Sequence, residues 1–500
     1  MTAGAEVGQE GFSLPAEPDA VLDVLFDDQR IFSVAPTVFS SRGGRFHAAW
    51  PPVLAPHLTG STRVVVKEHL SGKVLLDEPV RFDDSADRTR VRDRQGRPVA
   101  VDKFGFLVRM FTDADQGTAQ HLASSAARLV HDINAFGVAG FLAYGSLLGA
   151  VRNGHLIGHD TDVDTAYVSN YDHPADIARE SFALERFLVG LGWEMARMRI
   201  GLIRAVFPDL AGDTRHIDIF TAVHDGTRLY VNPFVSAEMP RSAVVPLGEV
   251  TFEGVQVPAP AEPGAVLEAM YGPSYIVPDP SFAYDPPRWL KRQSNAGYGN
   301  YRLRRALWQQ RLKGQWKDGR PAASGFAREV SAQEGRDATI VDVGCGSGSD
   351  AAWFAESGHR VIGIDYVVGP LTRLTGLARR RDLPAEFRTV SLYDLRATVA
   401  AGAQLAGEPA EDLVLYAKDL LDVIEPEGRT NFWLLARTAL LRRGRLHLRF
   451  RTRGNRAGLK EPGFRALDPD VIEAEALARG AHVLSRKDGH RATVMVLTWR

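Results

Sequence analysis

The chain has 500 residues, of which 45% are hydrophobic and 24% are charged, as in ordinary folded proteins. Sixty lysines and arginines against 61 aspartates and glutamates leave a net charge of -1, so the overall charge predicts no nucleic-acid partner and no acidic membrane partner. At about 150 residues per domain, this length predicts more than one folded unit.

The chain contains a single cysteine, Cys345, which excludes an intramolecular disulfide and a cysteine-cluster zinc site. The first residues, "MTAGAEVGQEGFSLPAEPDA", have neither the basic nor the apolar region of a signal peptide. No later run approaches the roughly 18 apolar residues of a membrane-spanning helix. We therefore expect a cytoplasmic protein.

Residues 1–118 have the pattern of a small, mostly antiparallel β domain. The segments "TRVVVKEHL", "GKVLLDEPVRF" and "RPVAVDKFGFLVRMF" are rich in residues that favour strands, and turn-forming residues separate them. The sequence does not indicate what this domain does.

A second unit, residues 119–297, begins with a predicted helix. In "TAQHLASSAARLVHDINAFG" the apolar residues recur at three- and four-residue steps until Gly137 ends the pattern. The turn-rich run "YGPSYIVPDPSFAYDPPRW" marks the end of this unit. A basic linker, residues 298–330, and a C-terminal α/β unit, residues 331–500, follow it. The predicted fold class is therefore α/β multidomain.

The stretch from residue 288 to residue 320 contains ten basic residues and one acidic residue, a local net charge of +9. One interpretation is a solvated linker helix. The alternative is a surface that binds a phosphate-rich polymer or makes peripheral contact with an anionic membrane.

Three aspartates on alternate residues, Asp160, Asp162 and Asp164, end the segment "YGSLLGAVRNGHLIGHDTDVD". In a strand they would share one face, where carboxylates repel one another unless a cation lies among them. Magnesium prefers oxygen ligands and also binds substrate phosphates. The cluster therefore predicts a magnesium site, with a solvated acidic loop as the alternative.

Other residues of this unit complete the predicted site. Gly145 and Ser146 enter a predicted helix after the strand "GFLAY", where backbone N–H groups can bind a phosphate. Arg152 adds a cation for the same phosphate. Asp218 lies in the apolar strand "RHIDIFT" and needs a positively charged partner, which a metal shared with the first cluster would supply.

These blocks resemble the polymerase-β-type nucleotidyltransferase superfamily. More narrowly, "YGSLLGAVRNGHLIGHDTDVD", "HIDIF" and "LEAMYGPSY", which fall between residues 120 and 287, resemble the LicD branch with its phosphorylcholine and fukutin-type phosphoribitol transferases. The resemblance implies that Asp162 and Asp164 bind the metal and that Asp218 is the third ligand and helps to orient the attacking hydroxyl. It implies a supporting role for Asp160.

The chain departs from the LicD pattern at two positions, His159 and Thr161, where the family usually has a tryptophan and often an acid. The chemistry that the resemblance implies is transfer of a phospho-alcohol, such as phosphocholine, glycerol phosphate or ribitol phosphate. The donor would be CDP-linked, the acceptor a hydroxyl of a glycan or polymer, and the cofactor Mg²⁺, which would neutralise the phosphates.

A second motif follows in "ATIVDVGCGSGSDAAWFAESGHRVIGIDY". A buried strand leads into Gly344, Gly346 and Gly348, then a helix, then a strand that ends at Asp365, an order that suits a nucleotide-like cofactor whose ribose hydroxyls bind the acid. A Rossmann dehydrogenase is the alternative.

The form "VDVGCGSGSD", with Asp342 two residues before the first glycine, resembles motif I of class I S-adenosylmethionine-dependent methyltransferases. In "TVSLYDL", the resemblance implies that Asp394 faces the adenine of S-adenosylmethionine.

The segment "DLVLYAKDLLDVIEPEG" resembles the fourth strand of that fold. Related methyltransferases of bacterial polysaccharide assembly often have an arginine and a histidine where this chain has Lys418 and Asp422. Asp422, His447 and Tyr416 are candidate bases, although His447 fits a core histidine better and Cys345 a packing residue.

Three hypotheses remain open. The first is a bifunctional transferase of cell-surface glycan or teichoic-type polymer biosynthesis, which adds a phospho-alcohol and a methyl group. The second keeps only the methyl transfer to an acceptor oxygen and treats the LicD-like unit as a binding module. The third is a non-catalytic scaffold that docks polymer.

Overall fold

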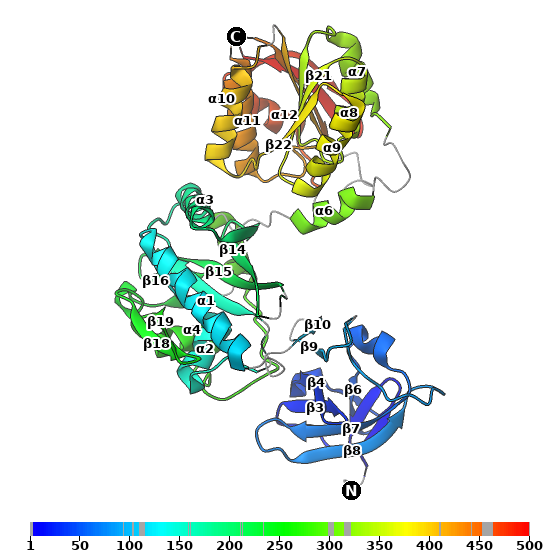
Figure 1. Ribbon diagram of the computed structural model, residues 1–500, viewed down its shortest axis with the longest axis vertical. Helices are drawn as coiled ribbons and strands as arrows, with labels where there is room; N and C mark the ends of the chain where they lie inside the picture. The colour runs from blue at the N-terminus through cyan, green and yellow to red at the C-terminus, as the bar shows by residue number, and fades with distance from the viewer. Residues whose placement is uncertain are drawn as a thin grey trace. The chain divides into compact units, whose positions relative to one another are not determined.

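The computed structural model describes residues 4–499 except positions 94, 103–104, 110–115, 159, 161, 211, 213, 234, 299–304, 315–321, 410–411, 442 and 453–463. The chain divides into two compact units, Met1–Asn300 and Tyr301–Arg500, as Figure 1 shows. The boundary falls within the predicted basic linker. Much of the predicted basic stretch, including residues 299–304 and 315–320, lies outside the described residues, as do His159 and Thr161.

The N-terminal part of the first unit is built from antiparallel strands, as predicted. Two four-stranded sheets have the orders β1-β2-β6-β5 and β4-β3-β7-β8, and β9 pairs with β10. Trp50 packs against four phenylalanines, Phe12, Phe26, Phe32 and Phe82, in the core. The strands are β1 (Glu6–Gly8), β2 (Gly11–Leu14), β3 (Leu22–Phe26), β4 (Gln29–Val34), β5 (Ser40–Arg42), β6 (Arg45–Ala49), β7 (Ser61–Glu68), β8 (Val74–Arg81), β9 (Ala100–Val101) and β10 (Leu107–Val108).

The rest of the first unit is an α+β fold around a seven-stranded sheet. Its central order is β11-β12-β15-β14-β13, with β16 and β17 continuing from β15. Only β12 and β15 pair in parallel among these neighbours. The elements are α1 (Gln116–Ala135), β11 (Ala139–Leu142), α2 (Tyr144–Asn153), β12 (Val163–Val168), α3 (Pro174–Gly190), β13 (Glu194–Arg199), β14 (Leu202–Pro208), β15 (Thr214–Asp225), β16 (Arg228–Val231), β17 (Val235–Glu238), β18 (Gly248–Phe252), β19 (Val255–Ala259), α4 (Pro263–Tyr271) and α5 (Arg288–Arg292).

The apolar stripe of α1 is buried, which confirms the predicted helix. Leu122, Ala126, Leu129 and Ile133 are at most 1% exposed and pack against the sheet in one core. Burial of each leucine or isoleucine side chain contributes about 1.5–3 kcal/mol. That core and the core of the N-terminal strands share no residue.

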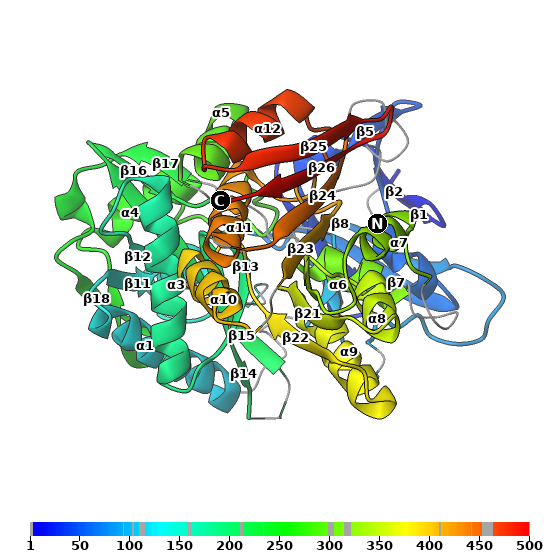
Figure 2. The ribbon, with the colours of Figure 1, turned by 90° about the horizontal axis from the view of Figure 1, so that it is seen from above.

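The second unit is a doubly wound sheet of seven strands with the order β22-β21-β20-β23-β24-β26-β25. The first five strands are parallel, and β26 is antiparallel to both of its neighbours. Helices α8 and α9 cover one face, and α10 and α11 cover the other (Figure 2). The elements are α6 (Arg305–Gly314), α7 (Gly325–Gln333), β20 (Thr339–Val343), α8 (Ser349–Glu356), β21 (Arg360–Asp365), α9 (Val368–Arg381), β22 (Ala385–Thr389), α10 (Leu395–Ala406), β23 (Leu413–Lys418), α11 (Pro426–Leu440), β24 (Arg445–Arg451), α12 (Pro469–Leu477), β25 (His482–Asp488) and β26 (Ala492–Thr498).

The strand order of this sheet reverses between β20 and β23. In doubly wound sheets, ligands bind at such a switch point, beside the carboxyl ends of the strands. The glycine loop follows β20 directly, so the fold places it where a cofactor is expected. Within the described part of the chain, no helix is both long and apolar enough to span a membrane.

Candidate functional site

The carboxylates of the first unit meet on neighbouring strands of one sheet. Asp164 on β12 is in register with Asp218 on β15, and Arg204 on β14 is in register with Asp218 from the other side. Side chains in register project from the same face of a sheet. Two segments far apart in the sequence thus form one charged row, and Asp164 belongs to a strand rather than to an acidic loop.

Asp218 has a cationic partner within the protein. Arg204 donates from Nε to Asp218 Oδ1 at 2.5 Å and from a terminal nitrogen to Oδ2 at 3.0 Å, while the Asp218 side chain is only 5% exposed. Burial lowers the pKa of Arg204, but the hydrogen bonds and charge of Asp218 outweigh it and the net shift is upward. Arg204 therefore stays charged. Sequence reasoning missed it, because a single arginine in a strand carries no motif.

A group of potential metal ligands lies next to this ion pair. Asp162, His216 and Asp218 each offer one ligand atom, and these atoms lie within 4.8 Å of one another. Two of the three predicted ligands belong to the group, and Asp164 does not. His216 was also missed, although its position two residues before Asp218 in "RHIDIF" could have indicated it, since alternate residues of a strand share a face.

Asp160 and Asp164 face the start of helix α2. A Cβ at Gly145 would lie 2.2 Å from Asp160 Oδ2 and 3.8 Å from Asp164 Oδ2, so any larger residue there would push the Asp160 carboxylate aside. The backbone N–H of Asp164 donates to the Ser146 hydroxyl oxygen at 2.9 Å. Gly145 and Ser146 thus make room for the cluster and hold it, and their predicted contact with a phosphate stays a prediction.

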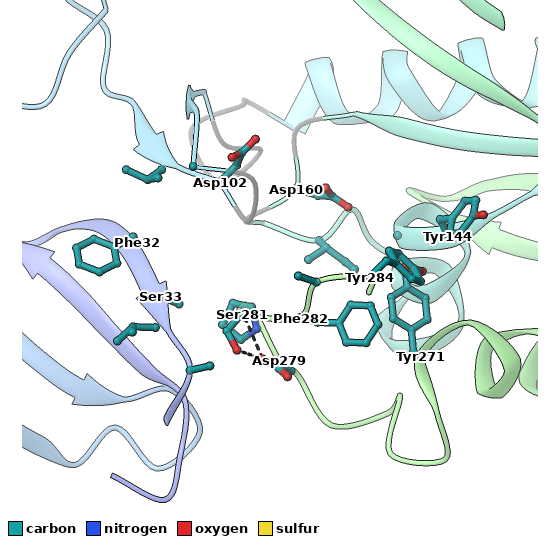
Figure 3. Close-up of a pocket in the computed structure, with 18 of the residues that line it drawn as sticks. Phe32, Ser33, Asp102, Tyr144, Asp160, Tyr271, Asp279, Ser281, Phe282 and Tyr284 are labelled. Atoms are coloured by element: carbon teal, nitrogen blue, oxygen red, sulfur yellow. Dashed lines mark hydrogen bonds between the residues drawn. The ribbon is translucent and has the colours of Figure 1, made fainter. Parts of the chain in front are cut away.

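The cluster opens into a pocket with an aromatic wall. Figure 3 shows Tyr144, Tyr271, Phe282 and Tyr284 close together near Asp160. The Tyr144 and Tyr271 rings each lie 5.6 Å from the Tyr284 ring. Burial raises the pKa of Tyr271 and Tyr284, which keeps both hydroxyls neutral. The pocket combines charged groups for phosphates with an apolar wall for an organic group.

The pocket also contains the remaining residues predicted for phosphate binding. Arg152, on the last turn of α2, lines it together with Asp162 and Asp164. Burial lowers the pKa of Arg152 from its usual value. The third LicD-like block, "LEAMYGPSY", contributes Tyr271 and Tyr275 to the lining. The three blocks noted in the sequence therefore converge on one pocket.

The loop between α2 and the aspartates is held by Glu253, at the turn between β18 and β19. Leu156 donates its backbone N–H to Glu253 Oε1 at 2.7 Å, and the Glu253 N–H donates to the Gly154 carbonyl at 2.7 Å. His155 Nδ1 lies 3.1 Å from Glu253 Oε2. Glu253 thus acts as a positioning residue, which sequence reasoning also missed.

In the second unit, the three loop glycines have the left-handed conformation that favours glycine. Their φ angles are +78° at Gly344, +56° at Gly346 and +73° at Gly348. Asp365, at the end of β21, accepts hydrogen bonds from the N–H groups of Gly346 and Val367 at 2.9 Å each. A carboxylate has about four acceptor positions, so Asp365 can hold the loop and still accept ribose hydroxyls.

Lys418 is fixed beside this loop. Its Nζ lies 2.7 Å from Asp350 Oδ2 in the first turn of α8, and Tyr416 donates to the same oxygen at 2.7 Å. Burial raises the pKa of Asp342, and the charge of Lys418 partly offsets this. Lys418 therefore places a positive charge among the buried acids at the carboxyl ends of β20 and β23.

Two of the three candidate bases have structural roles. Tyr416 is buried, and burial raises its pKa far above the usual value, so it is a poor base. His447 is buried too, and its Nε2 lies 2.6 Å from Glu334 Oε1, as expected of a core histidine. Asp394 caps helix α10 by accepting from the N–H groups of Arg396 and Ala397, and its predicted contact with adenine stays a prediction.

Asp422 is the remaining candidate base. Its residue is 0% exposed, and its two carboxylate oxygens form no hydrogen bond with the described residues. Arg451 Nε lies 3.7 Å from Asp422 Oδ2. Burial, with the nearby charge of Asp419, raises the pKa of Asp422 to about 7. A carboxyl group with a pKa close to neutrality is suited to proton transfer.

The raised pKa of Asp422 predicts how stability depends on pH. The folded state binds the Asp422 proton more tightly than the unfolded state does, so protonation of Asp422 stabilises the fold at low pH. This contribution to the unfolding free energy is lost as the pH rises towards 7. We expect the wild type to lose about 3 kcal/mol more unfolding free energy than Asp422→Asn between pH 5 and pH 8. Urea unfolding followed by fluorescence at both pH values measures this, and an equal change in both proteins would contradict it.

Comparisons with known proteins agree with both sites. Residues 137–262 match the model of the LicD/FKTN/FKRP nucleotidyltransferase domain, and residues 341–402 match a methyltransferase domain model. No curated protein matches the chain.

Solved structures resemble parts of the chain at low identity. A TehB-like S-adenosylmethionine-dependent methyltransferase from Corynebacterium glutamicum is 18% identical, with 39% of this chain and 98% of that one covered and a TM-score of 0.29. A second such methyltransferase, from Anabaena variabilis, is 18% identical, with 39% and 95% covered and a TM-score of 0.31. The glycopeptide N-methyltransferase MtfA is 13% identical, with 36% and 97% covered and a TM-score of 0.27.

The first family model covers Asp162 and the strands that carry Asp164 and Asp218. The second begins one residue before Asp342 and includes the glycine loop. The chain is therefore a transferase in which a LicD-type nucleotidyltransferase domain is followed by a class I S-adenosylmethionine-dependent methyltransferase domain.

Proposed function

We propose that this protein is a bifunctional, cytoplasmic transferase of cell-surface glycan or teichoic-type polymer biosynthesis. Its LicD-type domain would transfer a phospho-alcohol from a CDP-linked donor to a hydroxyl of a glycan or polymer. Its methyltransferase domain would transfer a methyl group from S-adenosylmethionine to an acceptor oxygen. The observation that carries the proposal is the row Asp164, Asp218 and Arg204 beside Asp162, within the residues that match the LicD model.

The carboxylates of the first site fit a divalent cation. Asp162 and Asp218 supply oxygen donors close enough to share an ion, and the pocket leaves space beside them for the donor's phosphates. A bound cation such as magnesium would neutralise the diphosphate and the departing CMP. The Asp218 carboxylate would orient the acceptor hydroxyl, and Arg152 would contact a phosphate.

The transfer itself needs little more than placement and charge. The acceptor oxygen would form a bond to the phosphorus of the phospho-alcohol, the bond from that phosphorus to CMP would break, and the proton of the acceptor hydroxyl would pass to the Asp218 carboxylate. Arg204 holds the Asp218 carboxylate in one orientation through two hydrogen bonds, so that the attacking hydroxyl meets a fixed acceptor. The wall formed by Tyr144, Tyr271 and Tyr284 would limit access of water, which competes with the acceptor.

In the second site, the residues around the glycine loop fit S-adenosylmethionine. Asp365 would accept the ribose hydroxyls, and the turns at Gly344 and Gly346 would let the backbone approach the cofactor. The methyl group would move from sulfur to the acceptor oxygen, while the proton of that hydroxyl would pass to the Asp422 carboxylate. S-adenosylhomocysteine and the methylated acceptor would be the products.

One observation favours a second candidate, in which only the methyltransferase domain is catalytic. Arg204 already supplies Asp218 with a fixed positive charge, so the first site could bind a nucleotide or a glycan without a metal. The two candidates differ in whether donor binding depends on a divalent cation.

The first test measures donor binding by calorimetry. We expect the wild type to bind at least one of CDP-choline, CDP-glycerol and CDP-ribitol in the presence of magnesium. Chelation of the metal and Asp162→Ala should each weaken this binding about tenfold or more. Chelation removes the cation that compensates the diphosphate, and Asp162→Ala removes one of the proposed ligands of that cation. Asp172→Ala is the matched control, since Asp172 is exposed and outside the pocket.

Two results would decide against metal-dependent transfer. Equal binding of the donor with and without chelator would favour the binding-module candidate. No binding of any CDP-linked donor would remove the support for transfer from such a donor.

The second test concerns the cofactor. Asp365→Asn should weaken S-adenosylmethionine binding about tenfold or more, because a charge-assisted hydrogen bond to a ribose hydroxyl contributes about 1.5–3 kcal/mol. Asp412→Asn is the control, since Asp412 is exposed just before β23, at the amino end of that strand. Absence of S-adenosylmethionine binding in the wild type would refute the proposed cofactor, and unchanged affinity in Asp365→Asn would refute the role of Asp365.

A further inference from the structure

The cation site of the first unit contains a nitrogen donor in addition to its carboxylates. His216 lies two residues before Asp218 on β15, so both side chains point to the same face of the sheet. The register of Val163 with Ile217 places Asp162, one residue before β12, beside His216. The backbone thus brings one imidazole and two carboxylates together at the end of the parallel strand pair.

The distances suit a single ion. His216 Nε2 lies 3.9 Å from Asp218 Oδ1, and the three ligand atoms are all within 4.8 Å of one another. Two ligands that each lie about 2.1 Å from one ion can be at most about 4.2 Å apart. The longest separation, up to 4.8 Å, exceeds this limit by about 0.6 Å, so side-chain rotations that move the ligand atoms by at least that much would bring the set to bonding distance.

The His216 ring is available for this role. Its side chain is 34% exposed and lines the pocket next to the aspartates. Among the residues that the structure describes, no hydrogen bond to the ring is found, and its closest charged neighbour is Asp218. Arg204 orients the Asp218 carboxylate, which still has acceptor positions for a metal.

We propose that His216 is a metal ligand together with Asp162 and Asp218, and that this donor set strengthens the binding of first-row transition ions relative to Mg²⁺, with Mn²⁺ as the spectroscopic probe. Magnesium favours oxygen ligands, whereas imidazole suits ions such as Fe²⁺ and Zn²⁺, and carboxylates bind both classes. The role of the metal in binding the donor rests on the proposed function. The ligand set does not, because it is inferred from the side-chain positions alone. It adds His216 to Asp162 and Asp218, two of the three predicted ligands.

The test uses the full chain freed of metal with a chelator and then loaded with Mn²⁺. Electron spin echo envelope modulation detects nitrogen bound to Mn²⁺ without any substrate or activity. The wild type should show the ¹⁴N modulation of a bound imidazole. His216→Gln, which keeps an oxygen donor of similar length, should lose that modulation and bind Mn²⁺ about tenfold or more weakly, with a smaller change for Mg²⁺.

His131→Gln is the matched control, because His131 is exposed on α1 and outside the pocket, and its modulation should match the wild type. The proposal is overturned if the wild type binds no Mn²⁺, if bound Mn²⁺ shows no ¹⁴N modulation, or if the modulation persists in His216→Gln. Binding of a CDP-linked donor with Mg²⁺ in the same proteins separates the ligand role of His216 from the proposed transfer reaction. Metal-dependent binding of a CDP-linked donor without ¹⁴N modulation would refute the ligand role of His216 and leave the proposed transfer intact.

Discussion

The repulsion among the four carboxylates of the first site is the constraint on which the rest of this site depends. Asp160, Asp162 and Asp164 come from one segment and Asp218 from another, and the parallel pairing of β12 with β15 brings them together. Such a group is stable only if cations compensate it. Arg204 supplies one positive charge through two hydrogen bonds to Asp218. The proposed metal and the positive end of helix α2 are the other sources of compensation.

The surrounding residues serve the same purpose in different ways. The missing side chain of Gly145 leaves space for Asp160, and the Ser146 hydroxyl accepts the backbone N–H of Asp164. Glu253 fixes the loop that leads to the aspartates. The site is therefore a charged row supported by contacts from Gly145, Ser146 and Glu253. This arrangement leaves the carboxylates lining the pocket, where they could hold the proposed cation against the phosphates of the proposed donor.

Local patterns in the sequence indicated the segments that form both candidate sites. The alternation of the aspartates, the buried stripe of α1 and the glycine loop before α8 depend on residues close together in the chain, and periodicity reveals such features. The roles of Arg204 and Glu253 depend on strand pairings between distant segments, which a single sequence does not reveal. His216 lies between these cases, because its spacing from Asp218 was visible but its distance from Asp162 was not.

In the second unit, too, some features were visible in the local sequence and others depended on contacts between distant segments. The succession of strand, glycine loop, helix and strand was visible in the motif, while the roles of Tyr416, His447 and Asp394 depended on their neighbours. Tyr416 and His447 are held by buried acids, and Asp394 caps a helix. Asp422 alone among the candidate bases is a buried carboxyl group without a hydrogen-bond partner among the described residues, with a pKa near neutrality. Hydrogen bonds and burial in the structure thus distinguish the three candidate bases, which residue type alone does not.

We propose that the metal and the donor's diphosphate share the site formed by Asp162 and Asp218. Phosphorus relaxation of a bound CDP-linked donor in the presence of protein-bound Mn²⁺ tests it most directly, because a paramagnetic ion accelerates relaxation only at short range. We expect strongly enhanced ³¹P relaxation of both phosphates in the wild type and its loss in Asp162→Asn. A donor that binds the Mn²⁺-loaded wild type without any enhancement would contradict the account.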